Sequence, residues 1–77
     1  MAAEAAPARQ ILTRREQDVT ALVARGLTNR QVAEQLLVTP RTIETQLEHI
    51  FAKLGVQTRT ELVAWAIRQD VAVPVSR

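Results

Sequence analysis

The stretch TPRTIETQLEHIFAKL, residues 39–54, constrains the fold most, because it predicts one helix with two unlike faces. Thr39 is a good N-cap, and Pro40 suits the first helical position, where its missing N–H costs nothing. Gly55 is expected to end this helix. One face carries the large apolar side chains at the spacing of a buried stripe: Ile43, Leu47, Ile50, Phe51 and Leu54. The opposite face carries Arg41, Glu44, Thr45, Glu48 and Ala52. This outer face is either a binding surface or the solvated side of an ordinary amphipathic helix.

Three further helices are predicted by capping signals followed by apolar stripes. The capping boxes are Thr13 with Glu16, Thr28 with Gln31, and Thr58 with Glu61. The expected inner stripes are Leu12, Val19, Leu22 and Val23; then Val32, Ala33 and Leu36; and, in a helix over about 59–69, Leu62, Val63, Ala66 and Ile67. The short turn at Leu37 and Val38 makes the second and third helices pack across each other, as in a helix-turn-helix. The sequence therefore predicts an all-α, four-helix helix-turn-helix domain.

The length of the chain suits one small domain, because 77 residues with 47% hydrophobic side chains can form a modest core. We expect the domain to span residues 11–69, with 1–10 as a flexible N-terminal arm or linker and 70–77 as a frayed C-terminal tail. The chain has no cysteine and no apolar run of membrane-spanning length. Its first residues lack a basic start and a continuous apolar segment, so we expect no signal peptide. These features favour a cytoplasmic protein without a membrane partner.

Catalytic chemistry is not indicated by any motif in the chain. His49 is the only histidine, and its place beside the buried stripe favours a helix-flank or partly buried position over a catalytic base. Glu44 and Glu48 are neighbours on one helix face, but no further ligand completes a metal site. We therefore expect a protein that is not an enzyme and uses neither metal nor cofactor.

Double-stranded DNA is a plausible partner, although the net charge of +2 is only weakly basic. Helix N-termini attract phosphate, and basic side chains surround two of them. The exposed face of the third helix predicts base contacts by Arg41, Glu44, Thr45 and Glu48. Contacts to the DNA backbone are predicted for Thr28, Asn29, Arg30, Thr39, Thr42, Lys53 and Arg59. Trp65 lies off the expected inner stripe, which predicts a dimer contact made by Ala64, Trp65 and Arg68. The alternative is that Trp65 covers the edge of the domain's own core, because large aromatic side chains often lie at a core boundary.

Several motifs, in this order and spacing, resemble the LuxR-type helix-turn-helix domain over about residues 11–69. They are Leu12-Thr13-x-x-Glu16, Gly26-Leu27-Thr28-Asn29-Arg30-Gln31-Val32-Ala33, Arg41-Thr42-Ile43-Glu44, Lys53-Leu54-Gly55-Val56 and Arg59-Thr60-Glu61-Leu62. The resemblance implies a DNA-binding output domain of a bacterial transcription regulator. It also implies a third helix in the major groove, a fourth helix that forms a homodimer on DNA, and control by an upstream sensor domain. No such sensor is present in these 77 residues, so we expect either an excised C-terminal domain or a stand-alone regulator.

The chain departs from the family pattern at Glu44, where many members carry Lys. A carboxylate can accept a hydrogen bond from the cytosine N4 amino group, but it cannot donate to guanine O6 and N7 as Lys does. The base preference of relatives with Lys at this position is therefore not expected for this chain.

Two other functions fit parts of the sequence. A sigma-factor region that binds promoter DNA has a similar helix-turn-helix, but it usually ends after its reading helix, whereas this chain predicts a capped fourth helix. A protein-interaction or dimerisation module without DNA contact would explain the low net charge and the Glu44–Glu48 pair. Such a module would show no salt-dependent retention on duplex DNA.

Overall fold

Four helices form the fold in the computed structural model, which describes residues 11–69. They are α2 (Arg14–Ala24), α3 (Asn29–Leu36), α4 (Pro40–Leu54) and α5 (Arg59–Arg68). No strand occurs within residues 11–69, and the predicted all-α, four-helix class is confirmed. The predicted arm, 1–10, and the predicted tail, 70–77, lie outside the described residues.

The helices begin where the capping residues predict. Thr13 and Thr28 both form complete capping boxes, in which the N-cap hydroxyl and the third helical side chain satisfy each other's backbone N–H. Thr58 caps α5 differently, because its hydroxyl accepts from Glu61 N while the Glu61 carboxylate accepts from Gln57 N at 2.6 Å. The φ of −134° at Thr58, against −67° at Thr13, brings the preceding N–H into reach of that carboxylate.

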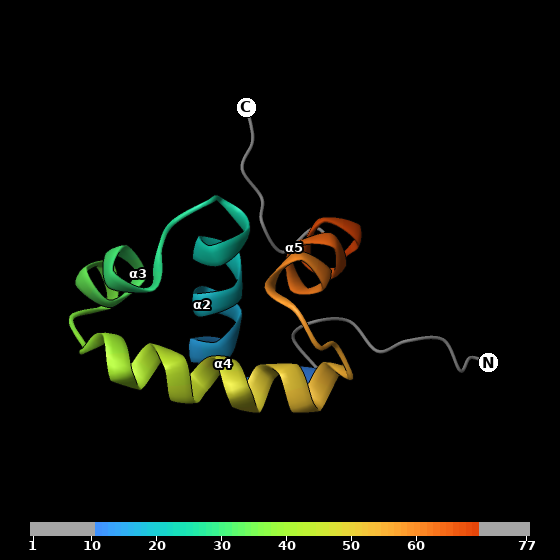
Figure 1. Cartoon of the computed structure of the whole chain (residues 1–77), viewed down its shortest axis with the longest axis horizontal. Coiled ribbons are helices and arrows are strands. Elements are labelled where there is room, and N and C mark those ends of the chain that lie inside the picture. The colour runs from blue at the N-terminus through green and yellow to red at the C-terminus, as the bar shows by residue number, and fades with distance from the viewer. Residues whose placement is uncertain (1–10, 70–77) are drawn as a thin grey trace.

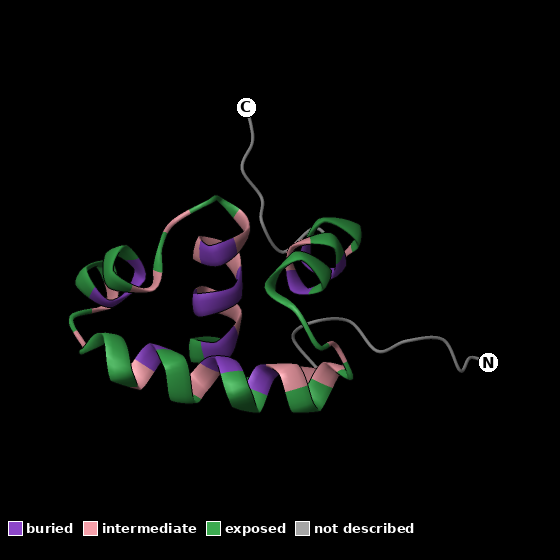
Figure 2. Ribbon diagram, in the orientation of Figure 1, coloured by how far each residue is buried: buried purple, intermediate pink, exposed green. Residues whose placement is uncertain are grey.

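α2 is the centre of the domain, and the other three helices pack around it. α2 stands on α4, while α3 and α5 lie on its two sides (Figure 1). α3 also packs against α4, which is the helix-turn-helix pair. The residues with the most deeply buried large side chains come from all four helices: Val19, Val23, Val32, Ile43, Ile50 and Leu62. Figure 2 shows that the side of α4 turned away from α2 is exposed. One hydrophobic core therefore holds α4 in place while its outer face stays free.

The inner face of α5 differs from the predicted one. Trp65 is only 8% exposed and belongs to the core cluster, whereas Ile67, predicted to be buried, is 64% exposed. Leu62 and Ala66 are buried as predicted, and Val63 is partly buried against the core. With about 100° of rotation per residue, Trp65 and Ala66 lie on either side of Leu62, so these three share one face. The prediction that Trp65 stands on the outer face was wrong.

The turn between α3 and α4 places a leucine in a conformation that suits glycine. Leu37 has φ 61° and ψ 42°, in the left-handed region, and its side chain is 90% exposed. In this conformation the Cβ is crowded by the backbone, which costs about 1–2 kcal/mol of stability. Because the side chain is exposed, burial of its apolar surface offsets almost none of this cost. Strain at this turn is therefore a local cost within the helix-turn-helix.

We expect Leu37→Gly to raise the free energy of unfolding by about 0.5–1 kcal/mol, because relief of strain exceeds the extra chain entropy of glycine in the unfolded state. Urea unfolding followed by circular dichroism measures the change. Glu34→Gly is the matched control, since it puts the same residue at an exposed helical position of α3 and should cost about 1 kcal/mol. A loss of stability in both variants would contradict the assigned strain.

Candidate nucleic-acid interface

The outer face of α4 consists of exposed polar side chains on a firmly held helix. The side chains predicted to contact bases are all exposed: Arg41, Glu44, Thr45 and Glu48. On the other side of the helix, Ile43 and Ile50 are fully buried. Within the described residues, none of the four exposed side chains makes a side-chain hydrogen bond or an ion pair. They are therefore available to a partner, on a helix whose position the core fixes.

The start of α3 presents unused backbone donors. The Thr28 hydroxyl accepts from Gln31 N at 3.1 Å, and the Gln31 carboxamide oxygen accepts from Thr28 N at 2.9 Å. The first two helical N–H groups, of Asn29 and Arg30, have no partner within the helix. These N–H groups lie at the positive end of the helix dipole and suit a phosphate oxygen.

The start of α4 offers fewer backbone donors and a pair of hydroxyls instead. Pro40 has no N–H, and the Thr39 hydroxyl accepts from Thr42 N at 3.2 Å. The hydroxyl oxygens of Thr39 and Thr42 are 3.1 Å apart, so one donates to the other. One hydroxyl hydrogen of this pair is left for another acceptor.

Lys53, predicted to be a phosphate contact, has a partner inside the domain. Its Nζ lies 2.6 Å from Glu16 Oε1, and this ion pair joins the end of α4 to the start of α2. Burial alone raises the pKa of the Glu16 carboxyl, but hydrogen bonds from Lys53 and Thr13 and the charge of Lys53 outweigh it. The pKa therefore lies below its ordinary value of 4.5. No sequence pattern links positions 37 residues apart, so this contact could not be foreseen.

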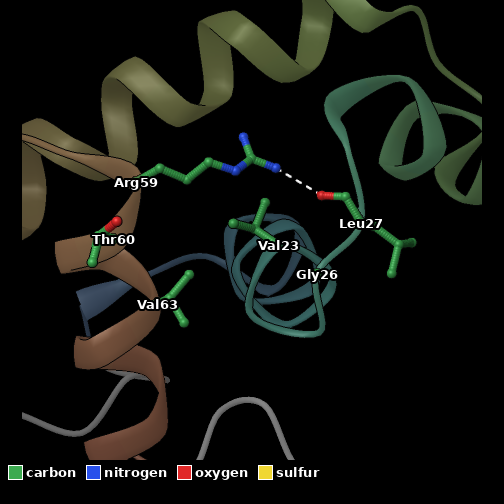
Figure 3. Close-up of a pocket in the computed structure, with 6 residues that line it drawn as sticks. All are labelled: Val23, Gly26, Leu27, Arg59, Thr60 and Val63. Carbon is green, nitrogen blue, oxygen red and sulfur yellow. Dashed lines mark hydrogen bonds between the residues drawn. The ribbon is translucent and has the colours of Figure 1, made fainter.

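Arg59, predicted to contact the DNA backbone, is exposed but also has hydrogen-bond partners within the domain. Its guanidinium donates to the Asn29 side-chain oxygen and to the Leu27 carbonyl oxygen, at 2.7 Å each. Figure 3 shows this side chain extended from α5 toward the loop that precedes α3. It borders a pocket of about 310 Å³ that Val23 and Val63 help to line. All four basic residues are exposed, but Arg59 and Lys53 differ from Arg30 and Arg41, which form no such bond within the described residues.

The outer face of α5 carries Ala64, Ile67 and Arg68, all exposed. The predicted dimer contacts Ala64 and Arg68 are thus on the surface, while Trp65 contributes to the core instead. Ile67 was missed as a surface residue because α5 contains an unbroken apolar run from Leu62 to Ile67. Two different inner faces fit such a run equally well by helical period.

Three other features bear on function. His49 is exposed on α4, which agrees with the helix-flank position that the sequence predicted as one alternative. In the part of the chain that the structure describes, no group of three or more His, Cys, Asp or Glu side chains could hold a metal ion. Over the same residues, each helix is too short or too polar to cross a membrane.

The chain is similar to bacterial proteins that are named as regulators. The "Putative HTH-type transcriptional regulator Rv0890c" of Mycobacterium tuberculosis is 48% identical over 58 residues, which cover 75% of this chain and 7% of that protein. The similarly named Mb0914c of Mycobacterium bovis has the same identity and coverage. The "Oxygen regulatory protein NreC" of Staphylococcus aureus is 38% identical over 62 residues, which cover 80% of this chain and 29% of that protein. The chain thus spans less than a third of the length of each of these relatives.

Residues 10–66 match the family described as "Bacterial regulatory proteins, luxR family", which confirms the resemblance drawn from the sequence motifs. The match begins just before the first capping box and includes most of α5. The chain therefore belongs to the luxR family of bacterial regulatory proteins.

Proposed function

We propose that this domain binds double-stranded DNA sequence-specifically, with α4 in the major groove, as part of a bacterial transcription regulator. The observation that carries the proposal is the outer face of α4, whose exposed polar side chains project from a helix fixed by Ile43, Leu47 and Ile50. A helix of this width fits the major groove, where each base pair shows a distinct pattern of donors and acceptors. Family membership supports the same function.

The side chains of α4 divide by the bases that they suit. Arg41 is a donor and matches the two acceptors of guanine, while the Glu44 and Glu48 carboxylates match the amino group of cytosine. Thr45 can donate or accept. The acidic pair also repels phosphate, so a wrong sequence, which offers no cytosine partner, should be bound weakly.

Phosphate contacts come from the helix starts. We assign them to the exposed or partly exposed residues Thr28, Asn29, Arg30, Thr39 and Thr42. Lys53 and Arg59 remain weaker candidates, because each would have to give up a short bond within the domain to reach DNA.

Pairing on DNA is proposed through α5, with Ala64, Ile67 and Arg68 facing the same residues of a second copy. One short helix per partner buries less than the roughly 1,200 Å² typical of stable interfaces, so pairing should be weak without DNA. Two half-sites on one duplex would raise the effective concentration. We also propose control by a sensor domain in a longer, cytoplasmic regulator, because the chain spans only a part of its relatives.

We expect the affinity for a duplex to fall about ten-fold or more over a several-fold rise in salt, because binding releases counterions from a few phosphates. Fluorescence anisotropy with a labelled duplex selected from random sequences measures this affinity.

Arg41→Ala should make the free energy of binding to the selected duplex less favourable by roughly 1–3 kcal/mol. The matched control is Arg25→Ala, which replaces the exposed arginine that caps the C-terminus of α2. This end of α2 lies away from α4 (Figure 1), so the variant should bind almost as the unaltered chain does.

Two results would overturn this proposal. Absence of duplex binding at low salt would favour a protein-interaction module without DNA contact. Equal losses in Arg41→Ala and Arg25→Ala would show that binding depends on overall charge and not on the face of α4.

A further inference from the structure

Arg59 makes two short charge-assisted hydrogen bonds from one guanidinium. It is the first residue of α5, and its Nη1 and Nη2 donate to Asn29 Oδ1 and to the Leu27 carbonyl oxygen at 2.7 Å. Figure 3 shows the side chain reaching from α5 toward the loop at Leu27. A forked pair of this kind fixes direction as well as distance, because the five guanidinium N–H donors lie in one plane.

These bonds tie α5 to the start of α3. Within residues 11–69, no other side-chain hydrogen bond or ion pair joins α5 to a part of the fold beyond the loop that directly precedes it. α5 packs mainly on α2, while α3 packs mainly on α4. An open pocket of about 310 Å³, lined in part by Leu27 and Arg59, lies beside this loop. The two bonds from Arg59 therefore add to the packing of Leu27 against the core in fixing the position of this loop.

The bond to Asn29 also fixes which end of its side-chain amide faces outward. Arginine has only donors, so the atom turned toward Arg59 must be the carbonyl oxygen of the amide. The Asn29 NH₂ group, which this bond does not use, is then left to donate. It lies at the helix start where the backbone N–H groups of Asn29 and Arg30 have no intrahelical partner. Without Arg59 the amide could turn over and present its oxygen, which repels phosphate.

We propose that Arg59 is a positioning residue for DNA binding: it orients the Asn29 amide as a phosphate donor and holds the start of α3 against α5. It does not itself contact the DNA backbone, contrary to the prediction from the sequence. This inference rests on the proposed binding of duplex DNA. It links α5, proposed to pair with a second copy, to a phosphate-binding helix start through a single side chain.

The test is the affinity of the full chain for a mixed-sequence duplex of about two helical turns, measured over a range of salt concentrations. A residue that neutralises one phosphate contributes about 0.9 to the slope of log affinity against log salt. We expect Arg59→Ala to weaken binding roughly ten-fold at low salt, the worth of one oriented hydrogen bond, while the slope stays close to that of the unaltered chain. Arg30→Ala is the matched control for a free arginine and should lower the slope by about 0.9.

The partner of Arg59 is tested by a double variant. Asn29→Ala alone should weaken binding about as much as Arg59→Ala, and the double variant should be little weaker than either, because both changes remove the same contact. A slope that falls by about 0.9 in Arg59→Ala, or losses that add in the double variant, would overturn the proposal. If the unaltered chain bound no duplex at any salt, the proposed function would fail instead.

Two further measurements separate the positioning role of Arg59 from a loss of fold in Arg59→Ala. The first uses NMR spectra of the unaltered chain without DNA, in which we expect the Arg59 guanidinium hydrogens to show contacts to the Asn29 side chain. Arg59→Lys, which can hold one acceptor but not both in a fork, should keep the fold and bind DNA with an intermediate affinity. Absence of the guanidinium contacts, or full affinity in Arg59→Lys, would contradict the positioning role.

Discussion

Replacing Trp65 with alanine is expected to leave a large fraction of the molecules unfolded. Trp65 is 8% exposed and packs in the core where α5 meets the rest of the domain. Truncation of a buried tryptophan costs about 3–5 kcal/mol, because it removes apolar burial and leaves a cavity. The free energy of unfolding of a small domain is only about 0.05–0.15 kcal/mol per residue, so this loss is comparable to the whole free energy of unfolding. Urea unfolding followed by circular dichroism, together with Trp65→Phe as a milder variant, measures it.

The control for Trp65 is Ile67, a large but exposed side chain of the same helix. Ile67 is 64% exposed, so Ile67→Ala should change the free energy of unfolding by less than about 0.5 kcal/mol. If α5 pairs on DNA, Ile67→Ala should weaken binding to two adjacent half-sites roughly ten-fold and leave binding to one half-site unchanged. The opposite pattern, with a stable Trp65→Ala and an unstable Ile67→Ala, would show that the inner face of α5 has been assigned wrongly.

The boundaries of the helices could be predicted from the sequence because capping is local. Thr13, Thr28 and Thr39 are each followed by the residues that complete their caps within three positions. α4, predicted from Pro40 to Leu54, has those bounds in the structure. Its amphipathic pattern is strong enough to separate the buried face from the exposed one without any tertiary information.

Contacts between residues far apart in the sequence could not be predicted, and they changed which basic residues are available to bind phosphate. Arg59 and Asn29 are 30 residues apart, and neither has a pattern that marks the other as its partner. Arg59 and Lys53 were both predicted to be free to contact phosphate, because net charge and spacing do not predict the hydrogen-bond partners of a long side chain. The inner face of α5 was ambiguous for a different reason, since six apolar residues in succession give no helical period. The roles of the α4 side chains on DNA stay predictions.

Glu16 is expected to be the most sensitive charged position in the domain. Its carboxylate accepts from Thr13 N at 2.9 Å in the capping box and pairs with Lys53 Nζ at 2.6 Å, while the residue is only 8% exposed. Glu16→Ala removes both interactions and should lower the free energy of unfolding by about 2–3 kcal/mol. Glu16→Gln keeps an acceptor for Thr13 but loses the ion pair, so it should lose less. Glu61→Gln is the control, because Glu61 is an exposed carboxylate at the same position of α5, and it should change stability by less than about 0.5 kcal/mol.

The pH dependence of stability separates the charge of Glu16 from its packing. Its folded-state pKa lies below the ordinary 4.5, so the unfolded chain binds a proton more readily than the folded one. The stabilisation is therefore fully present at pH values above the unfolded pKa, and it is lost as pH falls through the folded pKa. We expect the stability of the unaltered chain to fall in that acidic window by more than that of Glu16→Gln, in which the group no longer titrates. Parallel curves for the two proteins would show that the negative charge of Glu16 adds no net stability, either through the Lys53 pair or through the Thr13 cap.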